Sequence, residues 1–272
     1  MKKIAVIMSV YHGDSVEAFN ISMSSIFSQS YKYFDLYLQV DGNISVELLN
    51  VIQHYARNHH NFYVELIEEK KGLAWQLNRA IDRLLKNTSY SFIARMDADD
   101  ICEPTRFQKQ IEYFESNPHV AVCGTQVTEF HDNGYTQIKR IPTEHHILYK
   151  NIIKRCPFNH PTVMFNLSKI KIHDIKYNAS LMNTQDYYLW IELLAKGYVF
   201  GNLDESLLKF RINNDFHSRR GIKKAKNDFK ARLYAIRKLK IANFKNFSFL
   251  FLIVFLRVSP AFLKKIAYKY LR

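Results

Sequence analysis

The sequence of 272 residues has little cysteine, glycine or proline: it contains 3, 8 and 6 of these residues. The cysteines Cys102, Cys123 and Cys156 are odd in number and form no CxxC pair, which excludes a disulfide framework and a zinc site built on cysteine pairs. Such cysteine usage favours a reducing compartment. There is no internal repeat or low-complexity linker. Because 47% of the residues are hydrophobic, the chain can form one large domain or two small ones, and a disordered chain is excluded.

Long apolar runs are also missing. The most apolar stretch, Phe247–Leu256, has ten residues and lies between Lys245 and Arg257. As a helix it would span about 15 Å, half of a ~30 Å hydrocarbon core. We therefore expect an anchor that lies on a membrane surface, not a transmembrane helix. The N-terminal apolar run, Ile4–Val10, lacks a small-residue cleavage site after it, which favours a buried strand over a signal peptide.

Acidic residues are scarce in the last quarter of the chain. Residues 205–272 carry 18 basic and 3 acidic side chains, whereas residues 1–204 carry 21 and 22. The formal net charge of +14 therefore comes entirely from the C-terminal segment. A near-neutral body with a basic tail suggests an anionic partner: a membrane, a nucleic acid or a phosphorylated substrate.

Strand and helix patterns alternate in the first hundred residues. Apolar β-type runs are predicted at 4–10, 34–40, 62–67 and 91–96, and helical patterns at 15–28, 46–55 and 73–85. This order predicts an α/β fold with a parallel sheet covered by helices. Further on, the pattern predicts helices at 104–116, 186–195 and 219–240, strands at 120–130, 135–141 and 206–211, and a turn at 132–134.

An acidic cluster follows the fourth predicted strand. Asp97, Asp99 and Asp100 come directly after residues 91–96, and Asp41 follows the second strand. Because ligands bind at the carboxyl ends of strands in open α/β sheets, these side chains are expected to share one crevice. Three clustered carboxylates repel one another, and their oxygens suit Mg²⁺ or Mn²⁺. The alternative is an acidic turn that caps the helix beginning near Pro104.

Several ordered blocks resemble those of bacterial family 2 glycosyltransferases of the O-antigen and capsule type. The blocks are Ser9–Tyr11, Ser25–Tyr31, Val40–Gly42, Gly72–Ala74 with Leu77-Asn78, Ala94–Asp100, Asn159–Val163 and Asp186–Trp190. Together they cover roughly residues 3–221. The resemblance implies a GT-A fold with a mostly parallel central sheet and flanking helices, a nucleotide-sugar donor, and a Mn²⁺ or Mg²⁺ ion held by the acidic cluster.

The resemblance also implies roles for single residues. Asp99 is the expected direct metal ligand, Asp97 contacts metal or ribose, and Asp100 orders the loop. Asp186 is the expected base that takes the proton of the acceptor hydroxyl in an inverting displacement. From the residue type alone, Asp186 is better explained as an acidic residue at a helix N-terminus, where the helix dipole favours negative charge, and only the resemblance favours the catalytic role.

Other residues are expected to contact the two substrates, although each has a structural alternative. Those expected at the donor are Tyr11, Asp41, Arg95, Arg211, Arg219 and Arg220. Arginines are expected there because their side chains match phosphate oxygens. Those expected at the acceptor are His160, Gln185 and Trp190. The alternatives are a turn role for Asp41, packing for Tyr11, a structural histidine, and a solvated or membrane-facing basic surface for Arg219 and Arg220.

The chain departs from the family pattern at three positions. Gln185 stands where the family has Glu, Val40 replaces the first Asp of its "DDG" motif, and Lys70 replaces an Asn. The family Glu could help position the metal or the base, and Gln185 puts that role in doubt. Lys70 places a cation near the nucleotide.

The combined expectation is a peripheral enzyme on the cytoplasmic face of the bacterial inner membrane. Residues 1–218 would form the catalytic domain, with about 1–115 as the nucleotide-sugar half and 116–218 as the acceptor half, and 219–272 a membrane-associating tail. It would be a metal-dependent hexosyltransferase that moves glucose or galactose from a UDP-sugar to GlcNAc or GalNAc on undecaprenyl diphosphate.

Two alternatives remain open. A sugar nucleotidyltransferase would need a Gly- and Arg-rich loop after the first strand, where Tyr11–Ser15 stands instead. A non-catalytic protein that binds membranes or nucleic acid would use the basic tail. For nucleic acid, aromatics interleaved with the charges are expected, but the tail concentrates them in its apolar block.

Overall fold

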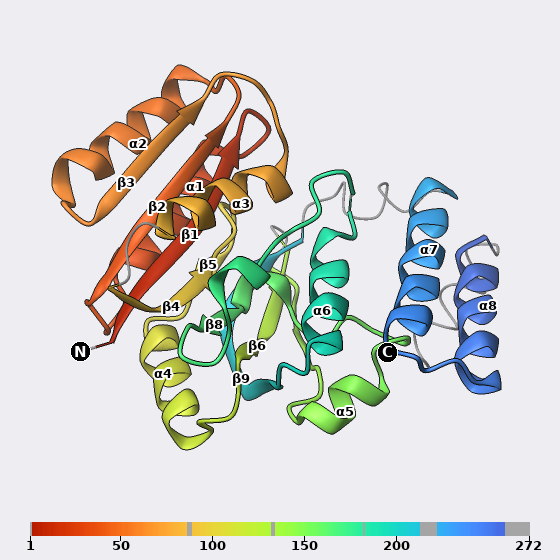
Figure 1. The fold of residues 1–272 in the computed structure, drawn as a ribbon. Helices are drawn as coiled ribbons and strands as arrows, with labels where there is room; N and C mark the ends of the chain where they lie inside the picture. The colour runs from red at the N-terminus through yellow and green to blue at the C-terminus, as the bar shows by residue number, and fades with distance from the viewer. Residues whose placement is uncertain (1, 86–88, 132–133, 182, 213–221, 259–272) are drawn as a thin grey trace.

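The computed structural model describes residues 2–85, 89–131, 134–181, 183–212 and 222–258 (Figure 1). Its strands are β1 (Lys3–Tyr11), β2 (Phe34–Asp41), β3 (Phe62–Ile67), β4 (Tyr90–Arg95), β5 (Ile101–Cys102), β6 (Val122–Phe130), β7 (Thr136–Lys139), β8 (Met164–Asn166) and β9 (Phe200–Arg211). Its α-helices are α1 (Val16–Phe27), α2 (Val46–Asn58), α3 (Leu73–Leu84), α4 (Arg106–Ser116), α5 (His145–Lys150), α6 (Gln185–Ala195), α7 (Ile222–Lys238) and α8 (Phe244–Val258). Short 3-10 turns occur at His160–Thr162 and Ile172–Asp174.

The sheet is parallel in its first half and mixed in its second. The strand order is β3-β2-β1-β4-β8-β6-β9-β5, and β7 pairs with β6 at the side. β1 to β4 are parallel, β8 is antiparallel to both β4 and β6, and β6 is parallel to β9. The α/β, GT-A-like architecture is thus confirmed, although the sheet is curled and mixed. The sequence pattern missed β5 and β8 because they have two and three residues.

Local residue choices explain several element ends. Ser15 precedes α1, and its hydroxyl accepts a hydrogen bond from the backbone N–H of Ala18 at 3.3 Å. Gly72 precedes α3 with φ of 86°, a left-handed conformation that favours glycine. The expectation that Pro104 lies in the first turn of the next helix is wrong, because α4 begins at Arg106.

Two apolar layers cover the sheet. One contains α1, α2 and α4 with side chains such as Phe19 and Phe107, and the other contains α3, α5, α6 and α7 with Trp190 at its centre. Alternate strand residues supply each layer, because successive side chains of a strand point to opposite faces. The carboxyl ends of β1, β2 and β4 meet at one edge, where the site described below lies.

The basic segment after residue 221 is packed onto the body in part. Figure 1 shows α6, α7 and α8 side by side, and Ala231, Ala235 and Ile236 of α7 are buried in the same layer as α6. Glu192 of α6 accepts a hydrogen bond from Tyr234 and pairs with Lys238. The boundary expected at 218/219 lies outside the described residues.

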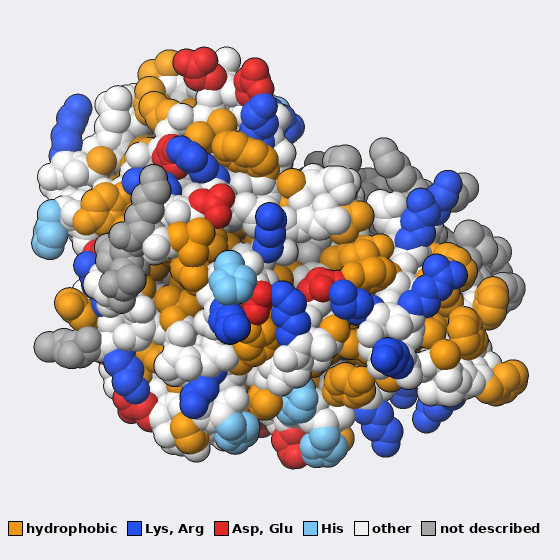
Figure 2. Space-filling view, viewed as in Figure 1, with side chains coloured by type: hydrophobic (Ala, Val, Ile, Leu, Met, Phe, Trp, Pro, Cys, Tyr) orange, Lys and Arg blue, Asp and Glu red, His pale blue; other side chains and the backbone are white. Residues whose placement is uncertain are grey.

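Helix α8 differs from α7 in what it exposes. Phe244 and Phe251 are 89% and 62% exposed, whereas Leu250 is buried. In Figure 2, Lys and Arg side chains gather over α7 and hydrophobic side chains over α8. Within the described ranges, no helix is long and apolar enough to cross a membrane.

Candidate active site

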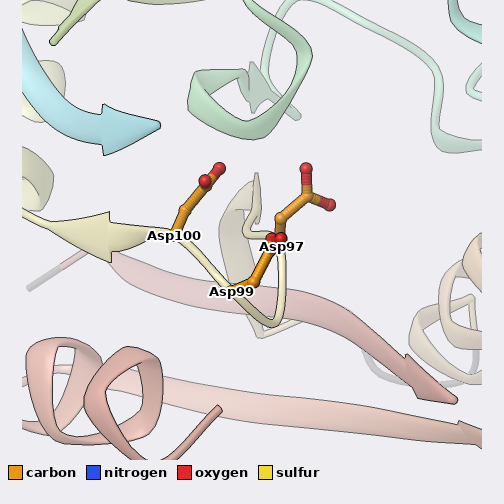
Figure 3. A group of neighbouring side chains, drawn as sticks. All are labelled: Asp97, Asp99 and Asp100. Carbon is orange, nitrogen blue, oxygen red and sulfur yellow. The ribbon is translucent and has the colours of Figure 1, made fainter. Parts of the chain in front are cut away.

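The acidic cluster forms a tight turn between β4 and β5. Asp97, Asp99 and Asp100 bring carboxylate oxygens within 4.8 Å of one another. Figure 3 shows Asp97 and Asp100 rising from the two ends of the turn toward the same side, with Asp99 between them. The sequence prediction that this cluster sits at a strand end is confirmed, since β4 ends at Arg95.

The end of β9 closes the turn from the other half of the molecule. The backbone N–H of Arg211 donates to Asp100 Oδ1 at 2.9 Å, and Arg211 Nε donates to the carbonyl oxygen of Asp99 at 3.1 Å. The guanidinium of Arg211 also lies 4.7 Å from the ring centre of Phe130. The tertiary structure therefore places Arg211 at the acidic turn, 111 residues away in sequence from Asp100.

The carboxylates of the turn are under electrostatic stress. Burial, followed by repulsion from Asp97, raises the pKa of Asp99 to about 6. Burial and the charges of Asp97 and Asp99 likewise raise the pKa of Asp100. Asp100 has no exposed surface, and its Oδ2 has no hydrogen-bond partner among the described residues. A hard divalent cation would relieve this repulsion and satisfy the oxygen, so the residues present fit Mn²⁺ or Mg²⁺.

A fourth carboxylate, which sequence reasoning missed, lies near the turn. Asp14 accepts a hydrogen bond from the backbone N–H of Tyr11 at 2.9 Å. Burial raises its pKa to about 7, and Asp99 and Asp97 add to the shift. The available signal was position: Asp14 follows the end of β1 closely, so it had to lie at the same sheet edge as Asp97.

Asp41 holds the loop before α3. Its Oδ1 accepts hydrogen bonds from the backbone N–H of Lys71 and from Gln76 Nε2, both at 2.7 Å, and its Oδ2 accepts one from the N–H of Gly72 at 2.9 Å. The side chain is buried. Three of its acceptor positions are thus occupied within the chain, which supports the turn role that the sequence left as an alternative to a donor contact.

Tyr11 is half-buried at the end of β1, at the same edge of the sheet as the acidic turn. The Nζ of Lys70 lies 5.4 Å from its ring centre. Lys70, predicted to bring a cation near the nucleotide, therefore faces Tyr11, a residue expected at the donor. A side chain at Gly13 would meet the Tyr11 ring within 3 Å, so glycine there allows the ring this position.

Arg95 lies behind the acidic turn. Its guanidinium pairs with Asp97 Oδ1, and the residue is only 2% exposed. This burial argues against the direct donor contact that the sequence suggested for Arg95.

Asp186, the residue expected to serve as the base, is the second residue of α6. It is half-buried, and Cys156 Sγ lies 3.9 Å from its Oδ2 as a weak donor. Burial, with the charge of Asp186, raises the pKa of Cys156 to about 12, so the thiol stays protonated and keeps its hydrogen for this contact. The adjacent Gln185 has a buried Oε1 without a hydrogen-bond partner among the described residues.

His160 and Trp190 are the further residues expected at the acceptor. His160 Nε2 lies 2.9 Å from the hydroxyl of Tyr177, and burial together with nearby Arg95 lowers the pKa of His160 well below its usual value. Trp190 is fully buried and packs edge-on against His160 and Phe158. A direct acceptor contact by Trp190 does not fit this burial, and the structural role considered for His160 is supported.

Two arginines expected at the donor or at the membrane, Arg219 and Arg220, lie outside the described residues.

Comparison with known proteins agrees with this architecture. The profile of glycosyl transferase family 2 matches residues 5–171. The amylovoran biosynthesis glycosyltransferase AmsE of Erwinia amylovora is 33% identical over 88% of this chain and 85% of its own. An Escherichia coli protein, named UDP-Gal:alpha-D-GlcNAc-diphosphoundecaprenol beta-1,3-galactosyltransferase, is 28% identical over 98% of this chain and 95% of its own.

Among solved structures, residues 1–349 of S. aureus TarS in complex with UDP-GlcNAc superimpose with a TM-score of 0.65 at 15% identity. The match covers 99% of this chain and 73% of that one, and this chain covers only 43% of a longer TarS structure. This likeness shows a shared fold. The fold is therefore of the GT-A type. By the profile match and the AmsE identity, the chain belongs to glycosyl transferase family 2.

Proposed function

We propose that this protein is an inverting, metal-dependent hexosyltransferase that uses a UDP-hexose, with glucose or galactose as the sugar. The observation that carries the proposal is the acidic turn, where three carboxylates within 4.8 Å of one another end a strand of a GT-A fold. The names of the relatives support the donor class: the E. coli relative is named for UDP-Gal, and the TarS structure holds UDP-GlcNAc.

The donor side would hold a divalent cation through Asp99 and Asp97, and the unpartnered Oδ2 of Asp100 would offer a third oxygen beyond the expected loop-ordering role. When bound, Mn²⁺ or Mg²⁺ neutralises the negative charge that gathers on the diphosphate leaving group. Arg211, fixed at the turn by its contacts to Asp99 and Asp100, supplies a further positive charge at this edge. Lys70 and Tyr11 line the adjoining rim, where the base and ribose would lie.

The acceptor side would supply the base. In a single displacement, the acceptor oxygen bonds to the anomeric carbon, the bond from that carbon to the diphosphate oxygen breaks, and UDP leaves. Asp186 takes the proton of the acceptor hydroxyl. Its position at the first turn of α6 favours the ionised carboxylate that this role needs.

The acceptor class follows from the same relatives. We propose GlcNAc or GalNAc on undecaprenyl diphosphate, in the synthesis of a surface polysaccharide, because the E. coli relative is named for such an acceptor and AmsE for amylovoran biosynthesis. A peripheral position on the cytoplasmic face of the inner membrane fits this acceptor. The exposed phenylalanines of α8 and the basic charge of the C-terminal segment would bind an anionic bilayer.

A donor panel tests the reaction. Full-length protein with Mn²⁺ is incubated with UDP-Glc, UDP-Gal, UDP-GlcNAc or GDP-Man and a GlcNAc- or GalNAc-diphosphate-lipid analogue. We expect transfer from a UDP-hexose, and NMR of the product to show the anomeric configuration opposite to that of the donor. Retention of configuration would contradict the proposed displacement. Pyrophosphate release from a nucleoside triphosphate and a sugar phosphate would instead identify a nucleotidyltransferase.

Sedimentation with vesicles tests the location. Phe251→Ser with Phe244→Ser should reduce co-sedimentation with phosphatidylglycerol vesicles, because both exposed apolar rings are removed. The matched control is Tyr135→Ser with Ile138→Ser, which removes exposed apolar side chains from the β6–β7 hairpin. Equal sedimentation of all three proteins would contradict a membrane contact through α8.

A further inference from the structure

The acidic turn contains its own positive charge. Arg95 is the residue at which β4 ends, and its guanidinium pairs with Asp97 Oδ1 beneath the turn. Arg95 is 2% exposed, whereas the side chain of Asp97 is 27% exposed, so water screens this pair only in part. Three carboxylates and one buried arginine therefore form a single charged group at the donor side.

The backbone fixes Arg95 where it is. Its N–H donates to the carbonyl oxygen of Val163 at 2.9 Å, and its own carbonyl oxygen accepts a hydrogen bond from Arg106 Nη2 at 2.8 Å. Arg106 is fully buried and also bonds to Gln110 Oε1 at 3.0 Å. Because both sides of the Arg95 backbone are held, the point from which its side chain reaches the turn is fixed.

This position is costly for an arginine. The Nε and Nη1 atoms of Arg95 are buried and have no hydrogen-bond acceptor among the described residues. Buried N–H groups without acceptors are unfavourable, and those of a charged group more so. The neighbouring His160 and Tyr177 are held in a hydrogen bond to each other, so they offer Arg95 no negative charge. The ion pair with Asp97 is the contact that offsets this cost.

We infer that Arg95 is a built-in counter-ion of the acidic turn, which occupies one oxygen of Asp97 and weakens the hold of the turn on a free divalent cation. A fixed unit charge a few ångströms from the carboxylates offsets part of their attraction for a metal ion. The negative charges of a nucleoside diphosphate restore that attraction. Arg95 thereby makes the cation bind with the nucleotide instead of before it, and lets both leave together after transfer. The effect of the nucleotide on metal binding rests on the proposed function, whereas the counter-ion role of Arg95 does not.

Binding of Mn²⁺ alone tests the inference without any transfer assay. Free Mn²⁺ is measured by electron paramagnetic resonance while the full-length protein is titrated, for the wild type, Arg95→Met and Arg95→Lys. Removing the charge in Arg95→Met should tighten the dissociation constant for Mn²⁺ about tenfold. Arg95→Lys keeps the charge and should stay within about twofold of the wild type. Arg140→Met is the matched control, since it removes an exposed Arg–Asp pair with Asp204 and should change nothing.

A second titration, in the presence of UDP, separates the counter-ion role of Arg95 from the effect of the nucleotide on metal binding. UDP should tighten Mn²⁺ binding strongly in the wild type and Arg95→Lys, and much less in Arg95→Met. Unchanged or weaker Mn²⁺ binding by folded Arg95→Met would overturn the inference. Should Arg95→Met fail to fold by circular dichroism, Arg95→Lys still decides, because a tenfold change there would mean that shape and not charge matters. The expected Mn²⁺ pattern without hexose transfer would overturn the proposed function alone.

Discussion

The two sides of the site hold their carboxylates in opposite ways. At the acidic turn, expected to bind the donor, Asp97, Asp99 and Asp100 crowd together, and burial with the neighbouring carboxylates raises the pKa of Asp99 and of Asp100. Asp186, the expected base, lies instead at the N-terminus of a helix, beside the neutral thiol of Cys156. The two arrangements suit different roles. A bound cation would relieve the repulsion within the crowded carboxylates, whereas a single carboxylate is suited to accept one proton.

The largest expected effect is at Asp186, the expected base. Asp186→Asn should reduce transfer about 100- to 10,000-fold, because the amide cannot accept the acceptor's proton. Radiolabelled hexose transfer measures the loss, and Mn²⁺ and UDP binding should stay at wild-type levels. Transfer at the wild-type rate would remove Asp186 from the reaction and leave it as a helix-end residue.

At the acidic turn, in contrast, metal binding and transfer should fall together. Asp99→Asn should weaken Mn²⁺ binding and lower transfer about 100- to 1,000-fold, because the charge on the leaving group loses its stabilisation. The matched control Asp204→Asn alters an exposed aspartate paired with Arg140 and should leave both quantities unchanged. Normal Mn²⁺ affinity in Asp99→Asn would contradict the assigned ligand.

The pH dependence of stability sharpens the comparison without any substrate. With the pKa of Asp99 at about 6 in the folded protein and an ordinary value near 3.8 after unfolding, the folded state binds the extra proton between these values. Above pH 6 the charged Asp99 therefore destabilises the metal-free protein, and this penalty fades as the pH falls.

Thermal unfolding in the presence of a chelator measures the effect. At pH 8 we expect Asp99→Asn to unfold at a higher temperature than the wild type, with the difference falling to about half near pH 5 and vanishing only below about pH 4. His160 is common to both proteins, so its own titration cancels in the difference. A constant difference across this range would show that the shift at Asp99 is not what sets it.

The smallest expected effect concerns the packing of the acceptor half. Tyr234→Phe removes the hydrogen bond from α7 to Glu192 of α6 and should lower the free energy of unfolding by about 1 kcal/mol. Transfer activity should be unchanged. Urea denaturation measures the loss, and Tyr33→Phe, at an exposed tyrosine, serves as the control. A loss of activity in Tyr234→Phe would mean that α7 also orients Asp186.

The sequence predicted the first half of the molecule well because its signals are local. The strands at Ile4–Val10 and Phe62–Ile67 lie where apolar runs predicted them, and Asp97 falls at a strand end. The second half depends on short pieces: β8 has three residues, yet it joins β4 to β6 and so connects the two halves of the sheet. A segment of that length has too few residues to show a period.

The sequence pattern also did not predict which single residues are buried. Arg95 was expected at the donor and Trp190 at the acceptor, but both are buried behind the surfaces they were expected to form. Asp14 escaped notice although it lies near the turn, since an aspartate in a loop looks the same whether its carboxylate is solvated or buried beside Asp99. Only the packing of β1 against β4 sets that distance.

The order of strands, helices and motif residues along the chain determined the α/β class, the acidic turn and the basic C-terminal segment, because backbone propensity, apolar periodicity and charge are properties of neighbouring residues. The tertiary structure alone decided which charges face one another: Arg211 against Asp99 and Asp100, Arg95 under Asp97, and Cys156 beside Asp186. Those encounters join residues from different elements, and the free energy of a buried charge depends on its neighbours in space rather than in sequence.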